Sequence, residues 1–82
     1  MKKSLYAIKD EITGIYAPPT PLMNDPDAYR QFEGFIENLG VLKHRAADYT
    51  CYFLGTFDDK TGIIEPECKI LFLGSEILVK GE

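Results

Sequence analysis

The sequence has no tryptophan, one histidine and only two cysteines, and this scarcity excludes several kinds of site. Cys51 and Cys68 have a spacing that matches no zinc motif, and His44 adds no convincing third ligand. The chain also lacks a Gly-rich phosphate loop, a nucleophile elbow and paired histidines. We therefore expect no catalytic residue, no metal and no cofactor, and we expect that the protein is not an enzyme.

Long hydrophobic runs are also missing, and no stretch approaches the length of a transmembrane helix. The start, Met1 to Ser4, is basic, but the charges of Lys9, Asp10 and Glu11 interrupt any signal-peptide core. We therefore expect an unprocessed cytosolic protein with reduced thiols and no membrane contact.

Cations are in the minority, with nine Lys and Arg against 13 Asp and Glu and a formal net charge of −4. Non-specific affinity for nucleic acid comes largely from phosphate neutralisation by Lys and Arg, so this balance disfavours a purely electrostatic binder. If the chain binds nucleic acid, its cations must gather on one patch, or stacking on aromatic side chains must carry much of the binding energy.

The chain has 82 residues, of which 45% are hydrophobic, and we expect one domain over residues 1–82. A core of this size stabilises a fold by only about 3 to 5 kcal/mol. Association of the chain into a homo-oligomer, such as a dimer, is therefore a reasonable expectation.

Two stretches, Asp10 to Gly14 and Asp58 to Gly62, share one turn pattern that begins with Asp and ends with Thr-Gly. In each, the Asp side chain can bond the backbone ahead of it, and the Gly suits the left-handed conformation that closes a hairpin. The flanking segments have strand composition: residues 4–9 and 15–17 around the first turn, and 50–58 and 63–73 around the second. We expect residues 18–21, which are rich in proline, to form extended polyproline-like chain.

Residues 24–40, between the hairpins, have the pattern of a helix. Asn24 is a capping candidate with Pro26 just inside the first turn, and Gly40 is a natural stop. The apolar residues recur at helical spacing as Tyr29, Phe32, Ile36 and Leu39, with Phe35 beside them. This stripe could receive a partner, but packing on the protein's own sheet is favoured. The sequence thus predicts an α+β fold: two β-hairpins flank one central α-helix (ββαββ), which packs on one face of an antiparallel sheet.

The register of the second hairpin can be predicted from burial. If Asp58 lies opposite Ile63, one face becomes apolar throughout, with Ile64 facing Phe57, Cys68 facing Phe53 and Ile70 facing Cys51. The other face then carries Thr56 against Glu65, Leu54 against Glu67 and Tyr52 against Lys69. Both cysteines fall on the core face. They could form a disulfide or redox pair, but two buried structural thiols are the favoured interpretation.

Two further segments leave alternatives open. Lys43, His44 and Arg45 form the only basic cluster, which is either a phosphate contact or, as favoured, a solvated loop, and residues 45–49 could form a helical turn. Ile77 to Val79 are more apolar than an exposed end should be. They either return as a short extra strand or cover a partner.

Several stretches together resemble one known family. They are the start Met1 to Asp10, the segment Thr13 to Tyr16 with its proline-rich exit, the central helix, and Tyr52 to Gly62 with its Gly-x-Phe-Asp-Asp-x-Thr-Gly turn. The likeness covers most of the chain up to about Leu73. It is to the small non-structural protein of gokushovirus-like microviruses, which are tailless phages with single-stranded DNA genomes.

The resemblance implies a DNA-binding phage protein of the host bacterial cytoplasm that acts in genome replication. Its role would lie in the change from duplex to single-strand synthesis or in delivery of single strands for packaging. The partners would be single-stranded DNA and a second copy of the chain. The alternative is a protein–protein adaptor or assembly factor that acts on a phage capsid or replication protein.

No motif of the family transfers residue by residue, so the candidate binding residues come from residue type alone. Aromatic rings could stack on bases, and cations could contact phosphates. The stacking candidates are Tyr6, Tyr16 and Tyr52, and the phosphate-contact candidates are Lys2, Lys3, Lys9, Lys43, Arg45 and Lys69.

Overall fold

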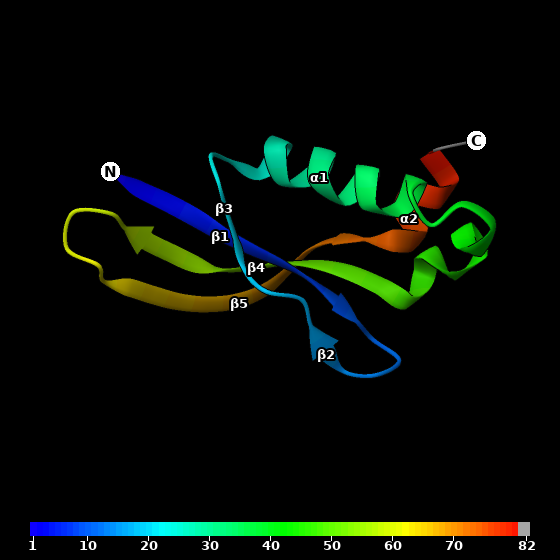
Figure 1. The fold of residues 1–82 in the computed structure, drawn as a ribbon, viewed down its shortest axis with the longest axis horizontal. Coiled ribbons are helices and arrows are strands. Elements are labelled where there is room, and N and C mark those ends of the chain that lie inside the picture. The colour runs from blue at the N-terminus through cyan, green and yellow to red at the C-terminus, as the bar shows by residue number, and fades with distance from the viewer. Residues whose placement is uncertain (81–82) are drawn as a thin grey trace.

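The computed structural model describes the backbone of residues 1–80 and the side chains of residues 1–40 and 44–77. The elements are β1 (Lys2–Asp10), β2 (Ile15–Tyr16), β3 (Thr20–Leu22), α1 (Asp25–Glu37), the 3₁₀ helix η1 (Gly40–Asp48), β4 (Tyr49–Asp58), β5 (Ile64–Leu73) and α2 (Gly74–Lys80). Figure 1 shows α1 lying along one face of an antiparallel sheet, so the predicted α+β class is confirmed. The predicted strand count is wrong, because the sheet has five strands rather than two hairpins alone.

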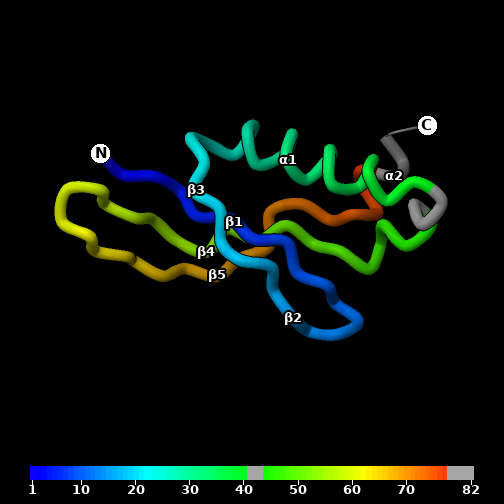
Figure 2. The backbone as a smooth tube through the Cα atoms, in the orientation of Figure 1, coloured from blue at the N-terminus to red at the C-terminus, as the bar shows by residue number. Residues whose placement is uncertain are grey.

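The sheet is built around β1. Its strands follow the order β2-β1-β4-β5, and β3 also pairs with β1. β1 runs antiparallel to β4 from the pair Lys2–Asp58 to the pair Asp10–Tyr49. Both hairpins therefore belong to one sheet, and the long β4–β5 hairpin extends past the N-terminal end of α1 (Figure 2).

β2 and β3 together form a broken edge strand along β1. Tyr16 of β2 lies opposite Lys9, and Pro21 of β3 lies opposite Leu5. The expectation of polyproline-like chain at residues 18–21 is therefore wrong for residues 20 and 21. Proline is compatible with an edge strand, because one side of such a strand has no ladder that needs its missing N–H group.

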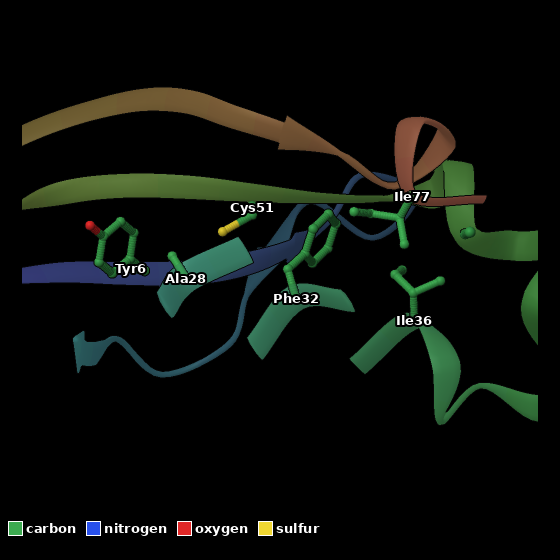
Figure 3. Close-up of a cluster of buried hydrophobic side chains, with 7 residues drawn as sticks. Tyr6, Ala28, Phe32, Ile36, Cys51 and Ile77 are labelled. Atoms are coloured by element: carbon green, nitrogen blue, oxygen red, sulfur yellow. The ribbon is translucent and has the colours of Figure 1, made fainter. Parts of the chain in front are cut away.

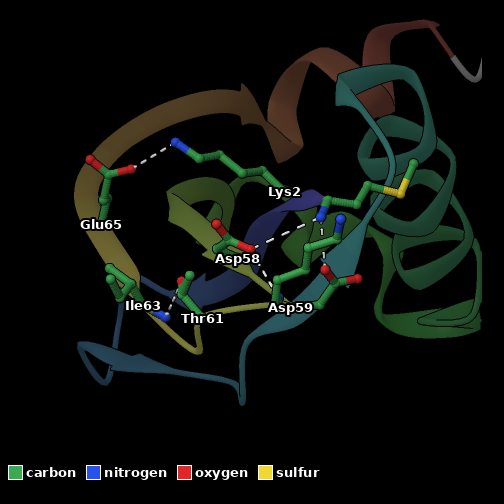
Figure 4. Close-up of polar contacts among 8 residues, drawn as sticks. Lys2, Asp58, Asp59, Thr61, Ile63 and Glu65 are labelled. Atoms are coloured by element: carbon green, nitrogen blue, oxygen red, sulfur yellow. Dashed lines mark hydrogen bonds and ion pairs between the residues drawn. The ribbon is translucent and has the colours of Figure 1, made fainter.

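The two hairpin turns share one geometry, as their sequences predict. Gly14 donates its N–H to the carbonyl of Asp10, and Gly62 donates to Asp58, both at 2.8 Å. These glycines have φ of 76° and 75°, which favours glycine over other residues. Figure 4 shows the second turn, where the Thr61 hydroxyl accepts the N–H two residues ahead at 3.3 Å.

Helix α1 begins at the predicted cap, where the Asn24 side chain accepts the N–H of Asp27 at 3.0 Å. The predicted stripe is buried at Phe32 and Ile36, joined by Ala28. Figure 3 shows these three side chains facing Tyr6 and Cys51 of the sheet, with Ile77 nearby. The helix thus packs on its own sheet.

The register of the second hairpin changes along its length. Phe57 faces Ile64 and Thr56 faces Glu65 near the turn, as predicted, but farther along Phe53 faces Lys69 and Cys51 faces Phe72. Two irregularities insert extra residues into β5, and each such bulge shifts the following side chains. The predicted pairs Phe53–Cys68, Cys51–Ile70 and Tyr52–Lys69 are therefore wrong.

This shift separates the cysteines. Cys51 is buried in the core and Cys68 is exposed, and both are free thiols. The prediction that both thiols are buried holds for Cys51 and is wrong for Cys68. A disulfide between them is also excluded in this structure.

The C-terminal segment is a helix, so the predicted extra strand is wrong. Glu76 Oε1 accepts the N–H of Leu73 at 2.9 Å, which stabilises the start of α2 as the acidic partner of a capping box does. Ile77 is 2% exposed and belongs to the protein's own core. The predicted helical turn at residues 45–49 is confirmed for residues 45–48, which end η1, whereas Tyr49 begins β4.

Candidate nucleic-acid interface

Three predicted binding residues meet on the sheet face opposite α1. Lys9 of β1 lies opposite Tyr16 of β2, and Tyr52 of β4 lies opposite Ala7. The Tyr16 and Tyr52 rings meet edge to face, with centroids 5.2 Å apart and planes at 69°. Lys9 Nζ lies 5.2 Å from the Tyr16 centroid and 5.7 Å from that of Tyr52. We call Lys9, Tyr16 and Tyr52 the tyrosine cluster.

Strand alternation places the tyrosine cluster on this face. Tyr6 and Ile8 of β1 pack into the core under α1, so Ala7 and Lys9 point to the opposite side. The Asp10 turn then returns the chain so that Tyr16 is the cross-strand neighbour of Lys9. The position of the cluster therefore depends on a turn that the sequence encodes clearly.

A carboxylate lies beside the tyrosine cluster. Glu11 Oε1 is 3.3 Å from Lys9 Nζ, and Tyr52 donates its hydroxyl to Glu11 Oε2 at 3.0 Å. Hydrogen bonds from the side chains of Thr50, Tyr52 and Lys9, with Thr50 the largest contributor, lower the pKa of Glu11. The bond to Glu11 raises the pKa of Lys9. These contacts favour the ionised forms of both Glu11 and Lys9 at neutral pH.

Cys68 completes this part of the surface. Its Sγ lies 3.6 Å from the Tyr16 hydroxyl, within hydrogen-bond distance for sulfur, and this contact raises the pKa of Tyr16. Ile70, which faces Tyr52 across the β4–β5 pair, is 56% exposed. The face around the cluster is therefore mixed, with aromatic, apolar and thiol groups around one cation.

Tyr6 is not available for stacking. Its side chain is 3% exposed, and its hydroxyl donates to Asp25 Oδ1 at 2.7 Å. Burial, with a smaller contribution from this bond, raises the pKa of Tyr6 to about 12. The proposal of Tyr6 as a stacking residue is therefore wrong. Side chains alternate between the two faces of a strand, and Tyr6 lies on the core face together with Ile8.

The remaining cations do not join the tyrosine cluster. Lys2 and Lys3 pair with the far end of β4, and Lys2 Nζ bonds Glu65 at 3.1 Å (Figure 4). Lys69 Nζ lies 3.4 Å from Glu67 and 5.1 Å from the centroid of the Phe53 ring. Arg45 is exposed in η1, and the side chain of Lys43 lies outside the described residues. The predicted phosphate contacts are thus spread over the molecule rather than gathered.

Sequence reasoning did not identify Glu11, Thr50 and Cys68 as neighbours of the cluster. Glu11 and Thr50 lie near each other because β1 pairs with β4, although 38 residues separate the two strands, and local patterns do not report this pairing. Cys68 joins them only because of the β5 bulges.

A separate cleft of about 460 Å³ lies between α1 and the edge formed by β1 and β3. Its walls include Ile8, Leu22 and Phe32, and Gly34 leaves space on the helix side. Most residues that line it are apolar, but Arg30, Gln31 and Asn38 also contribute. The cleft is therefore a largely apolar groove with one guanidinium group in its wall.

Comparison with known proteins gives a family. A family model described as "Phage ORF5 protein" matches residues 3–77, which include α1 and all five strands except Lys2 at the start of β1. The chain belongs to this family. The phage origin suggested by the resemblance is thus confirmed at the level of the phage ORF5 family. No curated protein and no solved structure matches the chain.

None of the helices in the part of the chain that the structure describes is both long and apolar enough to cross a membrane. Within the same residues, His, Cys, Asp and Glu form no group of three that could hold a metal ion. Among the predicted site residues, the structure shows Lys9, Tyr16 and Tyr52 in contact with one another.

Proposed function

We propose that this phage ORF5 protein is a non-enzymatic protein that binds single-stranded DNA on the tyrosine cluster. The observation that carries the proposal is the pair of tyrosine rings around Lys9, with Tyr16 exposed and Tyr52 half-buried, on the sheet face opposite α1. A single-stranded nucleic acid presents bases that stack on aromatic side chains and phosphates that a nearby cation contacts. The proposed setting is the cytoplasm of a bacterial host infected by a gokushovirus-like microvirus. The protein would act there during single-strand synthesis or packaging.

Stacking must supply most of the affinity, because the net charge is −4 and the other lysines lie elsewhere. Stacking of a base on an aromatic side chain contributes about 1–3 kcal/mol. A single cluster of two tyrosines therefore gives modest affinity. We include a homodimer in the proposal, since two clusters that act on one strand raise the effective affinity without any new contact.

The test is fluorescence anisotropy of a labelled oligothymidylate, with a duplex of equal length and two salt concentrations. Tyr16→Leu and Tyr52→Leu keep apolar bulk but remove the ring, and each should weaken binding on the order of tenfold. Ile63→Ala is the matched control, because Ile63 is 61% exposed on the distant hairpin turn. Equal affinity for all four proteins, or no binding of the unmodified chain at low salt, would contradict the proposal.

The second candidate function is a protein–protein adaptor or assembly factor that acts on a phage capsid or replication protein. Exposed apolar side chains favour it, since Ile64 and Ile70 of β5 are each 56% exposed and Leu73 is 42% exposed. Salt separates the two candidates. Binding that depends on phosphate contacts weakens as salt rises, whereas an apolar interface does not weaken in this way.

A further inference from the structure

The position of the Glu11 carboxylate is defined by two donors from two neighbouring strands. Lys9 of β1 approaches Glu11 Oε1 at 3.3 Å, and the Tyr52 hydroxyl of β4 donates to Oε2 at 3.0 Å. Thr50 of β4 is the cross-strand partner of Lys9 and contributes to the lowered pKa of this carboxylate. One ammonium and one phenol hydroxyl therefore converge on a single anion.

The donors are part of the sheet, and the anion is not. Lys9 and Thr50 are cross-strand partners, and Thr50 is 3% exposed, so these side chains have little freedom. Glu11 is the first residue of the β1–β2 turn, with its backbone N–H bonded to the Asp48 carbonyl at 2.8 Å. Its side chain is 35% exposed and reaches the donors from the solvent side. It can leave by rotation of its own bonds, without movement of a strand.

Lysine, hydroxyl and phenol groups are typical contacts of the phosphates in protein–DNA complexes. A phosphate oxygen is an anionic acceptor like a carboxylate oxygen, so both can use the same donors. The tyrosine rings lie next to these donors, at a separation that lets one nucleotide use both. We propose that Glu11 occupies, in the free protein, the site that a DNA phosphate takes in the complex. This inference depends on the proposed function.

The proposal predicts the sign of a mutational effect. If Glu11 competes with phosphate, its removal strengthens binding of single-stranded DNA. If Glu11 only holds Lys9 and Tyr52 in place for DNA, its removal weakens binding. A loss of negative charge alone would act equally at any similar surface carboxylate.

The experiment compares Glu11→Gln with Glu65→Gln in the oligothymidylate titration. Glu65 is the matched control because it also bonds a lysine, Lys2, at 3.1 Å, but at the far end of the sheet. We expect Glu11→Gln to bind on the order of fivefold more tightly than the unmodified protein, with a smaller change for Glu65→Gln. Glu11→Ala should repeat the gain. Equal gains at both positions, or weaker binding by Glu11→Gln, would overturn the inference while the proposed function stands.

A second measurement covers the case in which no protein binds the oligonucleotide. Inorganic phosphate is titrated into isotope-labelled unmodified protein and Glu11→Gln, and NMR shifts are followed at Lys9, Thr50 and Tyr52. Shifts at these residues that are larger in Glu11→Gln would support an anion site held by Glu11, although the DNA function would have failed. Equal shifts in the two proteins, or none, would overturn the inference together with that function.

Discussion

At the residue scale, Cys51 and Cys68 lie in opposite environments. Cys51 is buried, and burial raises the pKa of its thiol to about 11, whereas Cys68 is exposed beside Tyr16. Because the thiolate is the reactive form, iodoacetamide at about pH 8 should modify Cys68 alone in the folded protein. Mass spectrometry of digested protein should show both thiols modified in denaturant. Modification of Cys51 first under native conditions would contradict the assigned faces.

The buried Cys51 thiol also predicts a pH dependence. Its pKa rises from the model-compound value of 9.0 to about 11 in the fold, chiefly through burial, so the folded state favours the protonated form. Stability from this group is complete below about pH 9 and falls as pH rises through the interval up to the folded value. Urea unfolding at several alkaline pH values should show this loss, with a shallower slope in Cys51→Ala. Identical slopes for both proteins would exclude the thiol as the cause.

A variant of Tyr6 tests whether this residue contributes to the stability of the core or to DNA binding. Its hydroxyl donates to Asp25 at the start of α1, so Tyr6→Phe should lower the free energy of unfolding by about 1 kcal/mol. The same variant should bind single-stranded DNA like the unmodified protein, since the ring is not on the surface. Urea unfolding and the oligothymidylate titration check the two parts. A loss of DNA affinity in a folded Tyr6→Phe protein would refute its assignment to the core.

At the scale of elements, Gly55 and Gly34 differ in whether their position can accept a larger side chain. A Cβ at Gly55, which has φ of 135° beside the β5 bulge, would collide with the Glu65 carbonyl. A Cβ at Gly34 in α1 would meet nothing within 4 Å. Gly55→Ala should therefore cost about 1–3 kcal/mol or more, whereas Gly34→Ala should stabilise the fold by about 0.5–1 kcal/mol. Thermal unfolding of both variants tests this, and the reverse order of stability would contradict the described hairpin.

Local chemistry made some elements predictable. The Asp10 and Asp58 turns, the Asn24 cap and the Phe32–Ile36 stripe depend on residues close in sequence, so their patterns predicted them correctly. The β5 bulges depend on pairing with β4 and on Gly55, and no local pattern reports them. The candidate site was likewise predictable only where it depended on residue type. Lys9, Tyr16 and Tyr52 could be named from residue type, but their contact with Glu11 and Cys68 needed the sheet register.

At the scale of the whole molecule, the strand edges limit how copies can associate. β5 is an edge strand of the sheet, and edge strands are prone to pair with other chains. Pro66 lacks an N–H group, and the irregularities along β5 interrupt the regular spacing of the backbone groups. Direct edge-to-edge pairing through β5 is therefore disfavoured. The proposed homodimer would therefore associate through side-chain surfaces away from the tyrosine cluster, because both clusters must stay open to bind one strand.

The two faces of the sheet differ in what covers them. α1 and α2 cover one face and close the core around Phe32, Ile36 and Ile77. On the other face, the Tyr16 side of the sheet is open, with that tyrosine 39% exposed. An acidic chain with one open aromatic face fits a ligand that binds by stacking more than one that binds by charge alone.

The most direct test of this account is an NMR titration of isotope-labelled protein with oligothymidylate. The account predicts that the largest amide shifts occur in residues 7–16 of β1 and β2 and around Tyr52 of β4, with little change in α1. It also predicts that the shifts at Tyr16 and Tyr52 disappear in the corresponding leucine variants. Shifts that centre on α1 or on the Asp58–Gly62 turn, or no shifts with excess oligonucleotide at low salt, would contradict binding on the tyrosine cluster.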